Sequence, residues 1–412
     1  MSTQKVKSII GPIQLLVPFD DVGLRGPLKY NQVKTMNQVY VSVEGEHITG
    51  VHEAVPSDYD GAWVELREKY TVLPGFIDCH THICFSGTRS RDFAMRNSGI
   101  SYLEISKAGG GIWDTVSRTR EASLEDLVHG INDRAEVLLR KGITTVEVKS
   151  GYGLSVKEEL KMLEAIKMAN ENTDINLIPT CLAAHIIPKD FTDGASAYLD
   201  LIIQELFPLI AEQKLSNRID AFIEEEAFNE KNTENYFNAA KEYGFDITVH
   251  ADQFSVGGSK VAIKHQAISA DHLEASGASE IEMLASSETT CVALPGASLG
   301  LGCAFTPARK ILDQGGMLAI ASDWNPGSAP MGDLITQASI LATYEKLSSE
   351  EVLAGITKRA ANALGLQDRG EIKAGKRADL VFYETDSYHE ILYQQGRLQP
   401  SKTMIGGRFI TP

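Results

Sequence analysis

Apolar runs alternate with amphipathic stretches along most of this chain, beginning near Val72. Four stretches have helical periodicity, and each precedes a short apolar run: 125–140, 156–170, 195–213 and 233–242. The predicted strands are 72–77, 144–149, 175–182, 220–223, 246–250, 267–272, 289–294 and 317–322. Strands that alternate with helices in this number favour a parallel sheet closed into a (β/α)8 barrel of the TIM type.

An open, doubly wound parallel sheet is the alternative architecture for this pattern. Such a sheet usually carries a glycine-rich phosphate loop directly after its first strand. Here that place holds His80, Thr81 and His82. The barrel is therefore the preferred interpretation.

The two ends of the chain have a different pattern. Residues 1 to 70 contain short alternating segments such as 39–43, which are broken by Gly, Asp and Asn. After a predicted helix at 348–364, the pattern becomes strand-like again. We therefore predict a small β-sandwich domain composed of residues 1–72 and 365–412, and an α/β barrel over residues 73–364.

Composition and charge narrow the classes of function. The 412 residues include 39 Lys+Arg and 55 Asp+Glu, and the net charge of −16 disfavours nucleic acid and anionic membranes as partners. The five cysteines include no CxxC pair, so we expect a reducing, cytoplasmic location without a disulfide framework. There is no signal-peptide pattern and no run of about 18 apolar residues, so no membrane segment is predicted.

Histidines and one aspartate lie at the predicted strand ends, where barrel enzymes carry their catalytic groups. His80 and His82 are two residues apart, so on a strand end their side chains point the same way. His250 ends the fifth predicted strand, and Asp323 follows the eighth. Three imidazoles and one carboxylate suit zinc or iron(II), and such a cation lowers the pKa of a bound water. The sequence thus predicts a metal-dependent hydrolase.

Several segments together resemble one family. Residues 74–82 and 375–381 resemble the amidohydrolase superfamily. The segments that resemble the imidazolonepropionases within it are 102–105, 108–112, 149–154, 250–253, 269–274, 294–297 and 322–328. That family hydrolyses the ring amide of 4-imidazolone-5-propanoate to N-formimidoyl-L-glutamate in histidine degradation, with one Zn or Fe ion. The resemblance implies the same cyclic-amide C–N hydrolysis here.

The resemblance also implies roles for individual residues. The implied metal ligands are His80, His82, His250 and Asp323. Asp323 and His272 are the implied catalytic residues. Some relatives carry Glu where this chain has Gln253, so proton transfer is assigned here to Asp323 and His272. The implied substrate-binding positions are Arg89, Tyr152, His185, Gln253, Asn325, Gly327 and Ser328. A homodimer acting on a small molecule with a carboxylate tail is expected from the resemblance alone.

Physical chemistry agrees with the substrate roles but leaves structural alternatives open. Arg89 can bind a carboxylate through two N–H groups, although Arg91 is a rival and either can be a solvated loop charge. Tyr152 can add a hydroxyl donor or only pack in a tight turn between two glycines. His185 can bind the ring or carbonyl oxygen, or only cap the loop at Pro188.

Alternatives also remain for the other candidate residues. His272 can stabilise an oxyanion, or be a core histidine bonded to Asp271. Residues 326–327 can be only a turn. We expect residues 224–226 to be a solvated acidic cluster, with Glu224 as a weaker candidate near the site. The glycines at 109–111 are expected to form a flexible closure over the site.

Two other functions remain as alternatives. A related nucleobase deaminase would use a Glu three residues after His250 as proton shuttle, and Gln253 argues against it. A catalytically inactive barrel scaffold would be expected to have lost metal-binding residues, yet all four are present.

Overall fold

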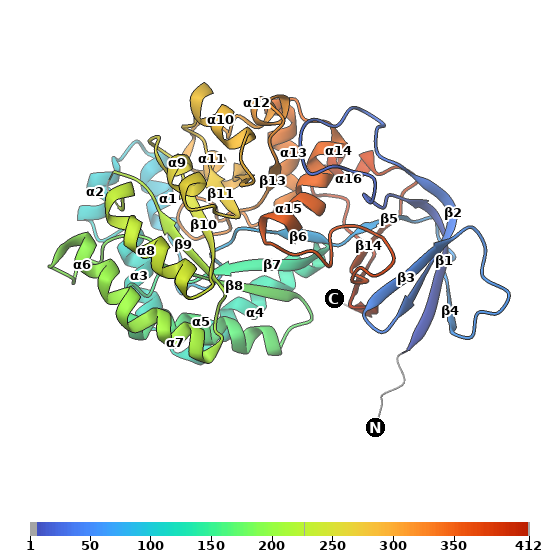
Figure 1. The fold of residues 1–412 in the computed structure, drawn as a ribbon, viewed down its shortest axis with the longest axis horizontal. Coiled ribbons are helices and arrows are strands. Elements are labelled where there is room, and N and C mark those ends of the chain that lie inside the picture. The colour runs from blue at the N-terminus through green and yellow to red at the C-terminus, as the bar shows by residue number, and fades with distance from the viewer. Residues whose placement is uncertain (1–5, 226, 411–412) are drawn as a thin grey trace.

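The computed structural model describes residues 6–225 and 227–410, and the chain forms two sheets in them (Figure 1). The barrel sheet with its helices occupies the left of this view, and the sheet from the chain ends occupies the right. Each sheet has its own cluster of buried apolar side chains. The barrel fold predicted from the sequence is confirmed.

The barrel sheet contains eight parallel strands, hydrogen-bonded in sequence order from β6 to β13. They are β6 (Phe76–Asp78), β7 (Ile143–Lys149), β8 (Asn176–Ala184), β9 (Arg218–Phe222), β10 (Asp246–Ala251), β11 (Ser269–His272), β12 (Thr290–Ala293) and β13 (Leu318–Ile320). Their residues are almost entirely buried, as expected for a parallel sheet covered by helices. The predicted strands therefore match the structure to within two residues at each end, apart from the first.

The first predicted strand is wrong in one respect, because its apolar run is divided between the two sheets. Thr71–Pro74 forms β5 of the chain-end sheet, and only β6 lies in the barrel. Gly75 is the crossing point: a Cβ there would lie 2.3 Å from Thr144 Oγ1. A continuous apolar run does not reveal that its two halves have different strand partners.

The barrel closes beyond its last regular strand. The amide of His82 donates to the Trp324 carbonyl (2.9 Å), and the amide of Asp323 donates to the His80 carbonyl (3.0 Å). These bonds join the segments that follow β6 and β13. They bring His80, His82 and Asp323 to one place although most of the barrel separates them in sequence.

Helices cover the outside of the barrel. After β6 the chain makes an excursion through α1 (Ser90–Asn97), α2 (Tyr102–Lys107) and α3 (Ile112–Glu121). The helices after it are α4 (Leu124–Arg140), α5 (Val156–Glu171), α6 (Gly194–Leu201), the π-helix η1 (Ile202–Leu206), α7 (Phe207–Gln213), α8 (Glu230–Glu242), α9 (Gly258–Lys264), α10 (Ala278–Ala285), α11 (Pro295–Leu301), α12 (Ala308–Asp313), α13 (Leu334–Glu345), α14 (Ser349–Gly355) and α15 (Lys358–Ala363).

The single helix predicted at 348–364 is two helices, α14 and α15. Thr357 leaves the helical conformation (φ −128°, ψ −98°). The preceding carbonyl, of Ile356, accepts a hydrogen bond from the Ile77 amide (2.8 Å). The break therefore gives β6 a hydrogen-bond partner on the side that β7 does not occupy.

The helical segment 194–213 is long and apolar enough, by length and composition alone, to cross a membrane. Here α6, η1 and α7 pack on the barrel, and Ile202, Leu206 and Phe207 are fully buried. The core helix of a soluble protein can pass the same test. The segment contains Asp200, Gln204 and Glu205, so it is not a continuous run of apolar residues and does not contradict the expectation from the sequence.

The chain ends form one mixed sheet with the order β16-β15-β14-β5-β1-β2-β3, and β4 lies beside β1. The strands are β1 (Lys7–Leu16), β2 (Met36–Glu44), β3 (His47–His52), β4 (Ala62–Glu65), β14 (Leu380–Tyr383), β15 (Lys402–Ile405) and β16 (Arg408–Ile410), and a short helix, α16 (His389–Tyr393), lies between β14 and β15. The central pair β5–β14 joins the two ends of the chain. Residues 1–72 and 365–412 remain the proposed extent of this domain.

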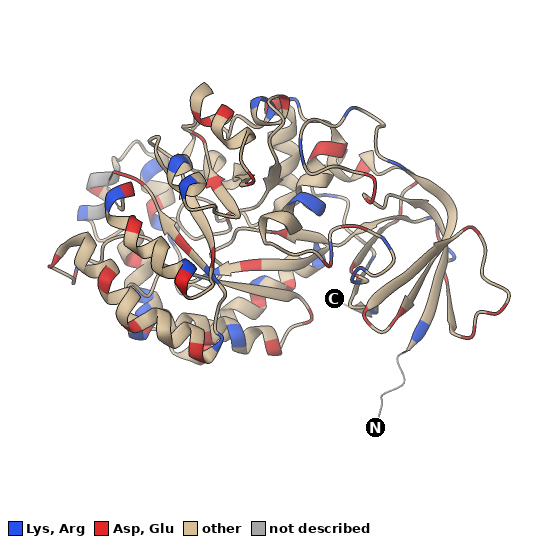
Figure 2. Cartoon of the chain, viewed as in Figure 1, with Lys and Arg blue, Asp and Glu red and all other residues tan. Residues whose placement is uncertain are grey.

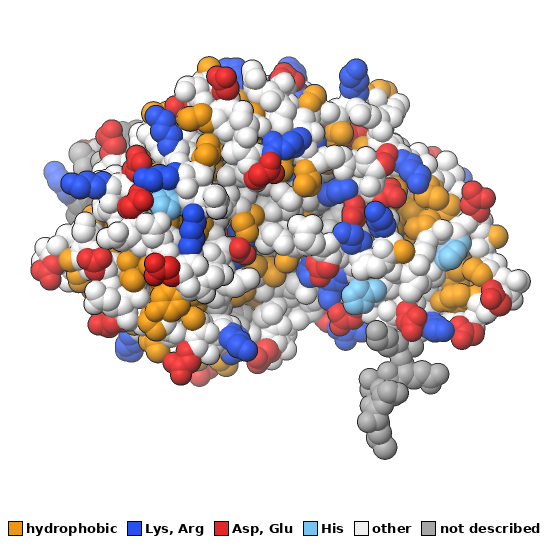
Figure 3. Space-filling view, in the orientation of Figure 1, with side chains coloured by type: hydrophobic (Ala, Val, Ile, Leu, Met, Phe, Trp, Pro, Cys, Tyr) orange, Lys and Arg blue, Asp and Glu red, His pale blue; other side chains and the backbone are white. Residues whose placement is uncertain are grey.

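Lys and Arg residues are interspersed with Asp and Glu residues along the outer helices (Figure 2). On the face drawn in Figure 3, hydrophobic side chains lie in small groups among charged ones. On this face, acidic side chains lie among basic ones.

Candidate metal centre

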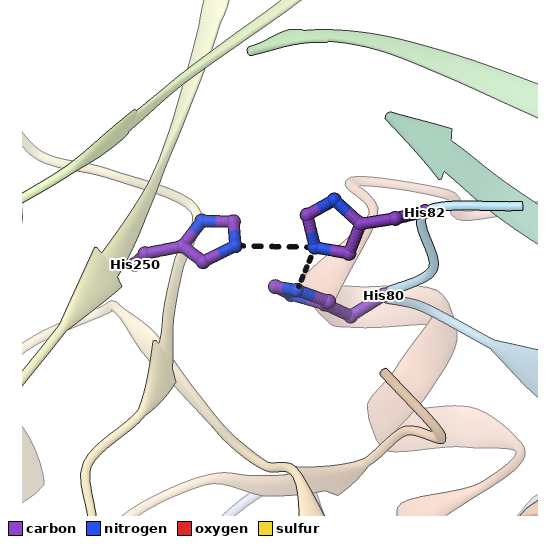
Figure 4. Close-up of side chains that lie close together, drawn as sticks. All are labelled: His80, His82 and His250. Carbon is purple, nitrogen blue, oxygen red and sulfur yellow. Dashed lines mark hydrogen bonds between the residues drawn. The ribbon is translucent and has the colours of Figure 1, made fainter. Parts of the chain in front are cut away.

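Three imidazole rings converge at the carboxyl ends of the barrel strands (Figure 4). His80 Nε2 lies 3.2 Å from His82 Nε2, which lies 3.4 Å from His250 Nε2. All three side chains are buried. His80 and His82 follow β6, and His250 belongs to β10, so the barrel places them together as predicted.

Asp323 joins this group from the segment after β13. Its Oδ1 atom lies 3.5 Å from His80 Nε2 and 3.4 Å from His82 Nε2. The backbone of Asp323 is left-handed (φ 52°), an uncommon conformation outside glycine that often occurs in active sites. The structure therefore brings together all four residues expected to bind the metal.

Carboxylates hold the far side of two of these rings. Asp271 Oδ2 lies 2.6 Å from His80 Nδ1, and Asp220 Oδ2 lies 2.9 Å from His250 Nδ1. A carboxylate at Nδ1 keeps the proton there and directs the Nε2 lone pair to a metal. This places the free lone pairs of both rings in the centre of the group.

The charge state of the rings fits a cation. Burial holds the pKa of His80 and His82 well below the usual histidine range and lowers the pKa of His250 to about 3. The rings are therefore neutral near pH 7, and lone pairs at this separation would repel one another without a cation between them. Three neutral imidazoles with a carboxylate are a suitable donor set for a divalent transition metal.

A buried lysine supports both orienting carboxylates. Lys149 Nζ lies 2.9 Å from Asp220 Oδ2, 2.7 Å from Glu147 Oε1 and 3.9 Å from Asp271 Oδ2. Although burial alone would raise it, His250 and Lys149 hold the pKa of Asp220 well below its usual value. Asp220 thus stays ionised beneath the metal-binding rings.

His272 lies beside the same group. Its ring centroid is 5.8 Å from that of His80, and together with His80 and Asp323 it forms a second set of atoms close enough to hold an ion. The alternative that His272 bonds to Asp271 is wrong, because Asp271 faces His80 and His272 Nδ1 faces Glu274 at 3.4 Å. Burial works to lower the pKa of His272, but the Glu274 carboxylate outweighs it and raises that pKa.

Tyr152 and His185 lie next to the metal-binding rings on one side. His185 is stacked on His82 (centroids 5.5 Å apart), and the Tyr152 ring lies 5.5 Å from His185. His185 Nδ1 lies 3.0 Å from the Gly151 carbonyl, so Nε2 is left for a ligand. The tight turn around Tyr152 is fixed by the buried Glu159, which accepts the amides of Gly151, Gly153 and Leu154 at 2.7–3.0 Å.

Arg89 and Gly327 meet although they are far apart in sequence. A Cβ at Gly327 would lie 2.6 Å from Arg89 Nη1. Arg91, the rival of Arg89, is exposed and donates to the Ala108 carbonyl (3.2 Å). The guanidinium beside the segment after β13 is therefore that of Arg89.

Asn325 organises the turn that contains the implied substrate-binding positions Gly327 and Ser328. Its Oδ1 accepts the amides of Gly327 and Ser328 at 2.8 Å, and its Nδ2 donates to the Asp323 carbonyl at 2.7 Å. Both backbone amides are thus used inside the turn in this structure. Asn325 holds Asp323 and this turn in place.

Gln253 lies in the loop after β10, and Glu224 holds that loop. Glu224 accepts the amides of Phe254 (2.9 Å) and Ser255 (3.2 Å) and the Ser255 hydroxyl (2.5 Å). The expectation of a solvated cluster is wrong for Glu224, which is buried, and holds for Glu225, which is exposed. Residue 226 lies outside the described residues.

The glycines at 109–111 are held to the protein rather than forming a free flap. The Gly111 amide donates to Asp92 Oδ2 (2.8 Å), and a Cβ at Gly110 would lie 2.3 Å from Asp92 Oδ1. The segment connects α2 to α3 and is fixed by a buried carboxylate. The expectation of a flexible closure ignored Asp92, which lies far from these glycines in sequence.

The model of the amidohydrolase family matches residues 71–410. An imidazolonepropionase from Bdellovibrio bacteriovorus is 43% identical over 390 residues, which cover 92% of this chain and 90% of the relative. The chain belongs to the imidazolonepropionase family of amidohydrolases. A second imidazolonepropionase, from Vibrio vulnificus, is 39% identical over 366 residues, with 88% and 89% of the two chains covered.

Solved structures support the fold of this imidazolonepropionase family member. Atrazine chlorohydrolase from Arthrobacter aurescens TC1, crystallised with zinc, has a TM-score of 0.72 at 16% identity, covering 98% of this chain and 95% of the other. Identity this low shows the fold alone.

Sequence reasoning missed the residues that support the centre. These are Glu147, Lys149, Asp220, Asp271 as a partner of His80, and Asp92. Lys149 and Asp220 could have been noticed, because each is a charged residue within an apolar barrel strand. Asp92 gave no such signal, since it lies in a polar segment.

Proposed function

We propose that this imidazolonepropionase family member hydrolyses the ring amide of 4-imidazolone-5-propanoate to N-formimidoyl-L-glutamate. The observation that carries the proposal is the convergence of His80, His82 and His250 with Asp323 at the carboxyl end of the barrel. The names of the relatives at 39–43% identity support the substrate.

The proposed metal is one zinc or iron ion, bound by His80, His82, His250 and Asp323. The two sets of close ligand atoms share His80. Because His80 Nδ1 faces Asp271, only Nε2 is free, and it cannot bind two ions at once. When bound, the ion would polarise the scissile carbonyl and make a water more acidic.

The proton steps are assigned to Asp323 and His272. Water adds to the ring carbonyl carbon; Asp323 takes the proton of this water and passes it to the ring nitrogen as the C–N bond breaks. Asp323 Oδ1 lies 3.4 to 3.5 Å from the imidazoles of His82 and His80, so it is within reach of a water bound at the same centre. His272, whose Nδ1 faces the Glu274 carboxylate, stabilises the developing negative oxygen.

The remaining residues are proposed to hold the substrate. Arg89 binds the propanoate carboxylate, and the Tyr152 hydroxyl adds a donor. His185 contacts the ring through Nε2, and Gln253 closes the opposite side. The turn of Asn325, Gly327 and Ser328 keeps Asp323 and Arg89 at a fixed separation, so that the carbonyl lies near the metal.

The test is to incubate the purified protein with enzymatically generated imidazolone propanoate and to measure the loss of the substrate's ultraviolet absorbance. His250→Ala should abolish turnover and bound metal, whereas His129→Ala, at an exposed position of α4, should change neither. Absence of turnover by the parent protein would refute the substrate assignment. Ammonia release from nucleobases would favour a deaminase instead, and metal-free protein would favour the inactive scaffold.

Homodimer formation, a cytoplasmic location, and the absence of nucleic-acid and membrane partners remain predictions. The location and the missing membrane partner rest on the sequence pattern, and the homodimer rests on the resemblance. Gel filtration with light scattering measures the oligomeric state directly.

A further inference from the structure

Asp92 is a buried carboxylate in the excursion between β6 and α4. Only 5% of the residue is exposed. Its Oδ2 accepts Arg89 Nε at 2.8 Å and the Gly111 amide at 2.8 Å. One oxygen thus joins an arginine at the start of α1 to the residue that caps α3.

This contact leaves one edge of the Arg89 guanidinium free. The Nε edge faces Asp92, and among the described residues neither Nη1 nor Nη2 donates a hydrogen bond to the protein. Nη1 lies against Gly327, in the turn that Asn325 fixes next to Asp323. The free edge therefore lies beside the segment that holds the metal-binding carboxylate.

The other end of α3 is fixed to the turn that carries Tyr152. Arg120 Nε donates to the Gly153 carbonyl (2.6 Å), and Arg120 Nη2 donates to the Leu154 carbonyl (3.1 Å). Helix α3 thus connects two anchors: Asp92 with Arg89 at its start, and Arg120 with the Tyr152 turn at its end. The two residues proposed to bind the substrate carboxylate are thus linked, through Asp92 and Arg120, to the two ends of this one helix.

We infer that Asp92 is a positioning residue that sets the specificity for a carboxylate-bearing substrate. It occupies the Nε edge of Arg89, so that the substrate carboxylate is bound by the two terminal nitrogens. It also holds the start of α3, which keeps Arg89 at a fixed distance from Tyr152. A rigid pair of donors binds a carboxylate with less loss of side-chain entropy than a free arginine. The inference rests on the proposed function.

The test compares Asp92→Asn in the parent protein and in an Arg89→Met background. Asparagine keeps the size and one acceptor but removes the charge that fixes the guanidinium. In the parent, we expect KM for imidazolone propanoate to rise about tenfold with kcat within about twofold, since the lost interaction acts on binding. In the Arg89→Met background, the same substitution should leave KM unchanged within about twofold, because its partner is gone.

Asp114→Asn is the matched control. Asp114 lies in the first turn of α3 and pairs with Arg118, whose side chain is largely exposed. This variant should keep the parent KM, kcat and metal content. Metal content should also be unchanged in Asp92→Asn, which separates positioning of substrate from damage to the metal centre.

The outcomes are distinguishable. An unchanged or lower KM in Asp92→Asn overturns the inference, and so does an equal rise in KM in both backgrounds, since that would be a general structural effect. A fall in kcat with constant KM also overturns it. If the parent protein does not consume the substrate at all, the proposed function fails and the inference fails with it.

Discussion

Replacing Asp271 by Asn removes the negative charge behind His80 and leaves its size unchanged. Asp271 Oδ2 lies 2.6 Å from His80 Nδ1, and both side chains are buried. Asn can still accept the Nδ1 proton, so the ring keeps its orientation. What is lost is the charge that makes the Nε2 lone pair a stronger donor.

The magnitude follows from these contacts. Loss of an outer partner of a metal-binding histidine typically lowers metal affinity about 10- to 100-fold, which is about 1.4 to 2.7 kcal/mol. Because the acceptor remains, we expect the lower end, about tenfold. Lys149 keeps Glu147 at 2.7 Å and Asp220 at 2.9 Å, so no buried cation is left unpaired. The metal-free protein should therefore lose less than about 1 kcal/mol of unfolding free energy.

Asp220→Asn should behave differently. Asp220 faces both His250 and Lys149 at 2.9 Å, so its loss weakens a buried ion pair as well as the orientation of a ligand. Removing one partner of a buried ion pair costs about 3 to 5 kcal/mol. Since Lys149 retains Glu147, the lower end of that range is expected.

Two measurements separate these effects. Competition with a chromophoric chelator gives zinc affinity, and urea unfolding of the metal-free protein gives stability. Asp246→Asn, at the start of β10 and away from the centre, is the control and should change neither. If Asp271→Asn bound zinc as tightly as the parent protein, the orienting role of this carboxylate would be refuted.

Two further substitutions test the surroundings of the centre. Gly327→Ala should raise KM about tenfold with little change in kcat, because the added Cβ would lie 2.6 Å from Arg89 Nη1 and displace the guanidinium. A KM equal to that of the parent protein would contradict the placement of Arg89. Ser348→Ala should lower the unfolding free energy by about 1 to 2 kcal/mol, measured by urea unfolding, because its hydroxyl caps α14 at the Glu351 amide (3.1 Å) and donates to the Leu28 carbonyl (2.8 Å). No effect on stability would show that the cap is replaced by solvent.

The periodicity of the chain by itself determined the barrel. Apolar runs at strand length, separated by amphipathic helices, can bury their residues on both faces only in a parallel sheet covered by helices. The position of His80, His82, His250 and Asp323 at strand ends then indicated the centre, because the carboxyl ends of all barrel strands meet on one face. Both conclusions depend only on the local pattern of apolar and polar residues and on the repeated βα unit of the barrel.

Contacts between distant elements were decided only by the tertiary structure. Asp271 is adjacent to His272 in sequence, yet it meets His80 across the barrel, whereas His272, whose backbone has a positive φ (84°), faces Glu274. The run after Thr71 divides at Gly75 because its halves pair with β14 and β7, which no periodicity reveals. Arg89 is directed by Asp92 and meets Gly327 only because the barrel closes between β13 and β6. Local sequence sets the direction of a side chain within its element, whereas strand register and barrel closure determine its partner.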